Sequence, residues 1–237
     1  MKAILCILSF VAMMAAPAAA QKARRVQGVQ KKKDTIFLQR EFSGLPGQEV
    51  YHVTYIDTAR NSPYYKKLSD FSMDKHSRER FREELAQLKK NGRLTRHRIT
   101  GIAGKWITLR YYKNKYYLYA ACDDYGIHEK ISLTDTAFLH DYGEGMLPQK
   151  INSFSKQDAK TFTLSLTGRE NKTSTLVIHL VDAKKGIAVF EEVGKRFWLM
   201  ADVTKIKQFP IIVNHCGEKR DEFKLDEPDY LKLIGRK

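Results

Sequence analysis

The chain has 237 residues, with 42 lysines and arginines against 27 aspartates and glutamates, a formal net charge of +15 at pH 7. After residue 20, no segment approaches the roughly 18 consecutive apolar residues of a membrane helix, so we expect no transmembrane segment there. The basic excess predicts attraction to an anionic glycan, a glycolipid or an envelope surface. A soluble protein whose surface is simply rich in lysine is the alternative interpretation.

Residues 1–20 resemble an export signal in their pattern. Lys2 precedes the apolar run Ala3–Met14, Pro17 ends that run, and Ala18–Ala20 forms an A-x-A cleavage site before Gln21. This order of features is typical of a signal peptide. We therefore expect export to the periplasm or cell surface of a Gram-negative bacterium. An uncleaved N-terminal anchor is the alternative.

Residues 21–34 carry many cations and almost nothing to bury, which predicts a basic, disordered arm. From residue 35 the pattern changes to alternating apolar and polar residues, and 35–237 are predicted to form a single β-rich domain. Ile36–Phe42 and Glu49–Ile56 are the first expected strands.

One amphipathic surface helix is predicted over about 72–91. Phe81, Leu85 and Leu88 form a narrow apolar stripe on it, and Asn91-Gly92 closes it. A second, short helix is expected after Pro228.

After Gly101 the chain is almost wholly β in pattern, with short strands separated by turns rich in Gly, Asn and Asp. Thr134–Lys160 is less regular and is expected to be a long connection. Because strands and helices do not alternate, a parallel α/β sheet is not expected. The fold predicted is mainly β, an antiparallel β-sandwich or a calycin-like barrel with one surface helix.

The segment WITLRYYKNKYYLYAAC, from Trp106 to Cys122, predicts a β-hairpin. A two-residue turn at Lys113-Asn114 or Asn114-Lys115 places its aliphatic residues together on one face. The opposite face then holds aromatic side chains around a guanidinium, which suits stacking on a sugar or another ring. The candidate ligand-binding residues are Trp106, Arg110, Tyr112, Tyr117 and Tyr119. A covering sheet or helix over this face is the alternative.

Cys122 and Cys216 are the two cysteines left after removal of the export signal. In an oxidising compartment the pair permits a single disulfide. Two separate buried thiols are the alternative.

No catalytic, metal-binding or phosphate-binding motif is present, and we predict neither a metal nor another cofactor. Nucleic acid is not an expected partner because no recognisable nucleic-acid module occurs. The sequence leaves the oligomeric state open. We expect an exported, non-catalytic envelope protein that binds an anionic or carbohydrate ligand. The alternative is a secreted hydrolase with a Cys nucleophile or a carboxylate pair drawn from Asp123, Asp124, Asp141, Glu144, Glu191 and Glu192.

Overall fold

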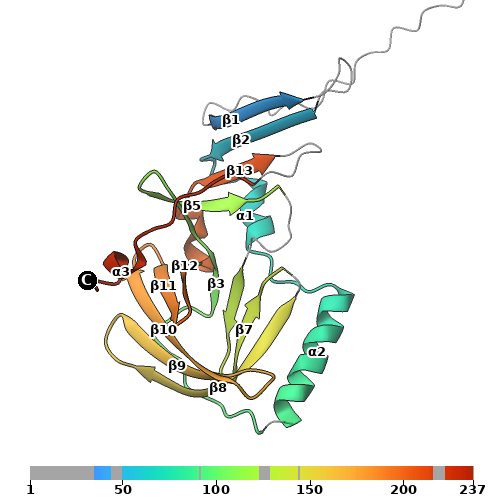
Figure 1. Cartoon of the computed structure of the whole chain (residues 1–237), viewed down its shortest axis with the longest axis vertical. Coiled ribbons are helices and arrows are strands. Elements are labelled where there is room, and N and C mark those ends of the chain that lie inside the picture. Colours follow the sequence, from blue (N-terminus) through green and yellow to red (C-terminus); the bar gives the residue numbers. More distant parts are fainter. Residues whose placement is uncertain are drawn as a thin grey trace, which may run out of the picture. The chain divides into compact units, whose positions relative to one another are not determined.

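The computed structural model describes residues 35–43, 50–90, 92–122, 129–143, 145–215 and 222–236, with the backbone alone for 40–43, 50 and 51. Residues Lys33–Lys237 form one compact unit. In Figure 1 this unit consists of a barrel, a smaller sheet and a long helix, α2 (Lys75–Lys90).

Eight strands close into an antiparallel barrel, which confirms the barrel alternative of the predicted fold. Its neighbours follow chain order around the wall, and β3 closes the ring between β12 and β6. The strands are β3 (Lys105–Thr108), β6 (Lys130–Leu133), β7 (Ala137–Asp141), β8 (Met146–Lys156), β9 (Thr161–Thr167), β10 (Thr173–Asp182), β11 (Ile187–Glu192) and β12 (Arg196–Asp202).

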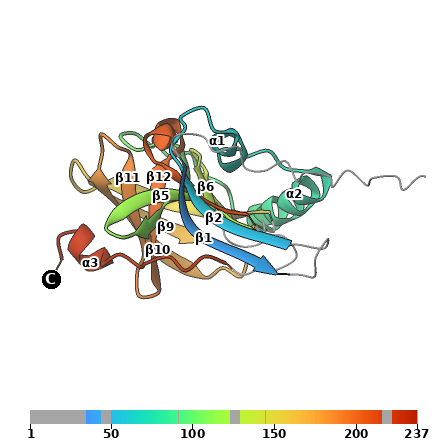
Figure 2. The same cartoon turned by 90° about the horizontal axis from the view of Figure 1, so that it is seen from above.

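A five-stranded sheet has the order β1-β2-β13-β5-β4. Its members come from three separate parts of the chain: β1 (Thr35–Ser43), β2 (Val50–Asp57), β4 (Arg110–Tyr112), β5 (Lys115–Ala120) and β13 (Ile211–His215). Only the β13–β5 pair is parallel. Within this sheet β13 lies between β2 and β5, and Figure 2 shows β1 and β2 side by side as an antiparallel pair.

The predicted hairpin is present, but only its tip belongs to this sheet. Tyr112 pairs with Lys115, and Lys113 and Asn114 have φ values of 47° and 62°, which confirms a two-residue turn of the type that suits right-twisted strands. The first arm of the hairpin is divided at Leu109 into β3 and β4, and there the chain leaves the barrel.

The predicted amphipathic helix is confirmed as α2 (Lys75–Lys90), which lies against β8. The short C-terminal helix is α3 (Tyr230–Leu233). Two further helices were not predicted, α1 (Pro63–Leu68) and the 3-10 helix η1 (Val203–Gln208). Ser62 caps α1 and Pro63 occupies its first turn, and both residue types are typical of the start of a helix.

The expectation that Thr134–Lys160 lacks regular structure is wrong. This segment holds β7 and β8, and β8 is an 11-residue strand. Its glycines mark the β7–β8 turn rather than a long loop, because Gly143 and Gly145 both have positive φ.

Apolar side chains fill the interior of the barrel. Part of its outer surface is buried as well. In β11, Ala188 and Phe190 belong to the interior cluster, while Ile187 and Val189 belong to a cluster shared with β2, β5 and β13. The sheet therefore packs on the outside of the barrel. Its other face carries a third cluster, to which Phe223 and Leu225 add cover.

The C-terminal segment is tied to the barrel by a charged contact. Arg236 Nη1 donates to Glu191 Oε1 at 2.7 Å, and His179 Nε2 donates to Glu191 Oε2 at 2.9 Å. Glu191 is only 8% exposed. Burial raises its pKa, but the hydrogen bonds from Arg236 and His179 outweigh burial and hold the pKa below its ordinary value.

Among the residues that the structure describes, no helix combines the length and the apolar character needed to cross a bilayer.

Trp106→Ala tests the assignment of this indole to the barrel core. Trp106 is 1% exposed and contacts Phe190 with ring centroids 5.3 Å apart. We expect the free energy of unfolding to fall by about 3–5 kcal/mol, because the substitution leaves a cavity. Ile36→Ala, at a side chain 59% exposed, should change it by less than about 0.5 kcal/mol. Urea denaturation measures both, and equal effects would contradict the assignment.

Glu191→Gln tests the C-terminal contact. Because the folded-state pKa of Glu191 is lowered, its stabilisation is complete above the unfolded-state pKa of about 4.3 and is lost as the pH falls through the folded value. At pH 7 the variant should lose about 1–3 kcal/mol. The difference from the wild type should shrink between pH 5 and pH 3 in urea denaturation. A difference that is independent of pH would show that the carboxylate charge contributes nothing.

Candidate functional site

The structure separates the predicted ligand-binding residues into two places. Trp106 lies inside the barrel, where its Nε1 donates to the Ala103 carbonyl at 2.8 Å. Tyr112, Tyr117 and Tyr119 lie together on the sheet face that bears the third cluster, and Arg110 pairs with Tyr117 across the hairpin. Trp106 therefore shares no face with the tyrosines.

The tyrosine face is covered rather than open. Tyr117 and Tyr119 are 6% and 3% exposed, and Phe223 packs edge-on against Tyr112 with centroids 5.2 Å apart. Ligand contact by these residues stays a prediction, and it would require the segment around Phe223 to move.

Beneath this cover lies a polar network that the sequence did not suggest. Asn214 Oδ1 accepts from His52 Nε2 at 2.7 Å and from Thr54 Oγ1 at 2.8 Å, and Glu222 accepts from the hydroxyl of Tyr119. Burial and the contact with Glu222 raise the pKa of Tyr119. Because the network joins β2, β5 and β13 to the C-terminal segment, its main effect is to fix the strand order of the sheet.

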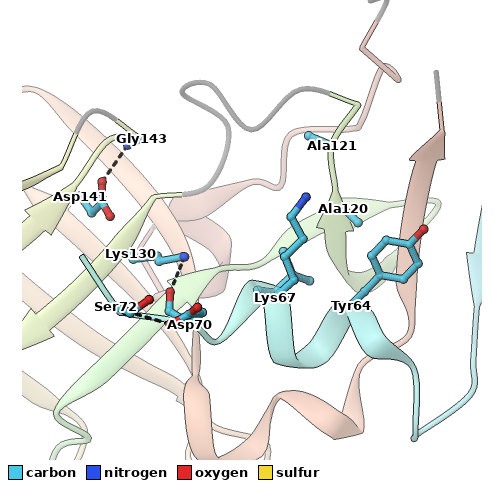
Figure 3. Close-up of a pocket in the computed structure, with 10 residues that line it drawn as sticks. Tyr64, Lys67, Asp70, Ser72, Ala120, Ala121, Lys130, Asp141 and Gly143 are labelled. Carbon is cyan, nitrogen blue, oxygen red and sulfur yellow. Dashed lines mark hydrogen bonds between the residues drawn. The ribbon is translucent and has the colours of Figure 1, made fainter. Parts of the chain in front are cut away.

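A pocket of about 300 Å³ lies where α1, the end of β5 and one end of the barrel meet. Figure 3 shows its lysines entering from opposite sides, Lys67 from α1 and Lys130 from β6. The lining consists of Tyr64, Lys67, Leu68, Asp70, Ser72, Ala120, Ala121, Lys130, Asp141 and Gly143.

The barrel-side lysine is held in place by local contacts. Lys130 Nζ donates to the Asp70 carbonyl at 2.5 Å and lies 5.8 Å from the centroid of the Phe71 ring. Asp70 Oδ1 accepts from the backbone N–H of Ser72 at 2.8 Å. That hydrogen bond lowers the pKa of Asp70, so its carboxylate is charged at neutral pH.

Small residues and a tight turn leave the space of the pocket open. Ala120 ends β5 and Ala121 follows it, both with minimal side chains. Across from them, Asp141 Oδ1 accepts from the N–H groups of Gly143 and Gly145 at 2.9 and 3.3 Å, which shapes the β7–β8 turn. The pocket thus combines two cations, two carboxylates, the hydroxyls of Tyr64 and Ser72, and apolar side chains.

A second cluster stiffens the barrel end beside the pocket. His140, next to Asp141 in β7, donates from Nε2 to Glu129 at 2.8 Å and stacks on Tyr142 at 3.8 Å between centroids. Arg196 donates to the Tyr142 hydroxyl at 2.7 Å and lies 4.2 Å from the Trp198 ring. Because successive residues of a strand face opposite sides, Lys130 next to interior Ile131 and Asp141 next to buried His140 face outward.

Most of the residues considered for hydrolysis are engaged elsewhere or lie outside the described residues, whereas Asp141 lines the pocket. Cys122 is disulfide-bonded, so no thiolate is available there. Glu191 contacts Arg236, whereas Glu192 contacts Lys195 and Arg196. Asp123, Asp124 and Glu144 belong to the part of the chain that is not described.

The pKa of Asp70 is lowered, so its charged carboxylate accepts hydrogen bonds. A general acid requires a carboxyl whose pKa is raised, and Asp70 does not match that role. Within the described ranges, no group of three His, Cys, Asp or Glu side chains is arranged to hold a metal ion.

Sequence reasoning did not find the pocket, because its lining comes from four separate stretches of the chain, 64–72, 120–121, 130 and 141–143. The alanine pair before Cys122 is the one signal that was available, since it interrupts an aromatic strand with small residues.

Neither the protein-family models, nor the curated proteins, nor the solved structures contain a match to this chain.

Peptide mapping tests the predicted disulfide. The parallel pairing of Val213 with Ala120 brings the strand end before Cys216 beside the strand end before Cys122, while Cys216 itself lies outside the described residues. We expect a non-reduced proteolytic digest to contain one Cys122–Cys216 linked peptide that disappears on reduction. Two free thiols, or Cys122 linked to Cys6, would contradict the pairing.

Proposed function

We propose that the protein is an exported, non-catalytic binding protein of the bacterial envelope whose pocket takes a small acidic saccharide. The single observation that carries this proposal is the lining of the pocket, where Lys67 and Lys130 share one space with Asp70, Asp141 and Ser72.

The chemistry of the lining suits a sugar that carries a carboxylate or phosphate. A lysine ammonium binds an anionic group, while a charged carboxylate accepts hydrogen bonds from sugar hydroxyls. Asp70 is such an acceptor, because its pKa is lowered. A purely apolar ligand is disfavoured, since it would remove water from these charges without replacing the lost hydrogen bonds.

The size of the pocket also favours a small ligand. A volume of about 300 Å³ lies at the lower end of the range for small-molecule sites, which is roughly 300–1,000 Å³. One or two sugar rings fit this space, whereas a longer chain would have to extend beyond it.

Two features support export. The first twenty residues have the order of an export signal. Cys122 is disulfide-bonded, and disulfides persist mainly in oxidising compartments outside the cytoplasm.

Binding is tested by thermal unfolding with galacturonic acid, glucuronic acid and glucose 6-phosphate, against galactose and glucose. We expect at least one acidic sugar to raise Tm, by about 2–4 °C per kcal/mol of binding linkage. The uncharged sugars should have a smaller effect.

Lys67→Met should weaken binding of that acidic sugar about tenfold, because a charge-assisted contact contributes about 1.5–3 kcal/mol. Lys66→Met is its matched control, since Lys66 is the neighbouring exposed lysine of α1 and does not line the pocket. Ala121→Trp should block binding by filling the pocket. Equal affinities for the wild type, Lys67→Met and Ala121→Trp, or no shift with any acidic sugar, would reject the proposal.

A further inference from the structure

The segment after α2 closes one end of the barrel and carries a row of cations. Ile99, Ile102 and Ala103 pack against the barrel interior. In Figure 1 the chain leaves the lower end of α2 and crosses the end of the barrel near β8 and β9. The sequence contains no aspartate or glutamate between Glu84 and Asp123, so the charge of this segment is positive throughout.

The exposed cations of this segment and of the β8–β9 turn are here called the basic end face, defined as Arg93, Arg96, Arg98, Lys156 and Lys160. All five are exposed. Lys156 Nζ lies 3.6 Å from the position that a Cβ on Gly101 would occupy, so β8 contributes to the same surface as the segment after α2.

The backbone under these cations is fixed. His97 N donates to the Asp135 carbonyl at 2.7 Å, and the His97 ring hydrogen-bonds the Ile151 carbonyl at 3.0 Å. Exposed Arg96 and Arg98 alternate with half-buried His97 and Ile99, as in an extended chain, where alternate side chains are about 6.6 Å apart. A rigid row loses less conformational freedom on binding than a flexible tail does.

Nearby acidic residues neutralise only part of the positive charge of the basic end face. Arg96 forms an ion pair with Asp135 at 3.4 Å, yet the Arg96 side chain is still 86% exposed. Asp158 is occupied by the N–H groups of Lys160 and Thr161 at 2.6 and 2.8 Å. Within the described part of the chain, Arg93, Arg98, Lys156 and Lys160 form no ion pair with a carboxylate.

We propose that the basic end face docks a linear acidic polysaccharide, at a site separate from the pocket. Charge complementarity and the three arginines favour carboxylate or sulfate groups, which a guanidinium binds through two parallel hydrogen bonds. The large hydrophobic residues that are exposed in the described ranges are Ile36, Val193 and Leu231, and none of them belongs to this face. The basic end face therefore has no exposed apolar side chain that could insert into a membrane. Phe162, the aromatic ring beside Lys156, is buried and cannot stack on nucleic-acid bases.

The test compares binding of the full-length mature protein to polygalacturonate, to neutral dextran, to anionic phospholipid vesicles and to single-stranded DNA. We expect salt-sensitive binding of polygalacturonate and none of dextran. Arg93→Gln/Arg96→Gln/Arg98→Gln should weaken it at least tenfold. The control Lys113→Gln/Lys115→Gln/Lys224→Gln removes the same charge from the five-stranded sheet and its cover, and it should change binding by less than twofold. Thermal melts of both triple variants check that they fold.

Equal losses in the two triple variants would show that net charge alone attracts the polymer, and would overturn the proposal. Stronger binding of the vesicles or of the DNA would overturn it as well. Ala121→Trp, which fills the pocket, should bind polygalacturonate as the wild type does, so this inference and the proposed function can fail separately.

Discussion

The packing of the five-stranded sheet on the outside of the barrel is the contact on which the rest of the structure depends. It requires β11 and β12 to be apolar on both faces, with Ile187 and Val189 outward under the sheet and Ala188 and Phe190 inward. Burial of this kind contributes roughly 25 cal/mol per Å² of apolar surface. The pocket lies at the margin of this contact, where α1 and the end of β5 meet the barrel.

Local sequence patterns predicted which segments form strands and helices better than they predicted which strands pair. The strand pattern of Ile36–Phe42, the stripe of α2 and the Lys113-Asn114 turn are all local features, and each led to a correct element. By contrast, β13 pairs with β2 and β5, which lie far from it in sequence. Such pairings depend on which apolar faces meet after collapse, and no short window of sequence records that.

The aromatic hairpin shows the same limit for the candidate site. Its register predicted correctly that Tyr112 and Tyr117 share a face, and their rings lie 6.4 Å apart. The sequence did not show which layer of the structure each part of the hairpin segment enters. Because the chain leaves the barrel at Leu109, Trp106 enters the barrel core while the tyrosines enter a different layer, under Phe223. The pocket was out of reach for a related reason, since its lining is assembled from residues that only the tertiary fold brings together.

We propose two polar binding sites on one apolar scaffold, a small pocket at the sheet–barrel junction and a basic end face. The central claim is that a small ligand binds in the pocket and not on the aromatic face. The most direct measurement is a titration of ¹⁵N-labelled protein with galacturonic acid, followed by amide chemical shifts. We predict that the shifts gather at Lys67, Ser72, Ala121, Lys130 and Gly143. Shifts confined to Tyr112, Tyr117 and Tyr119, with none around the pocket, would contradict the claim.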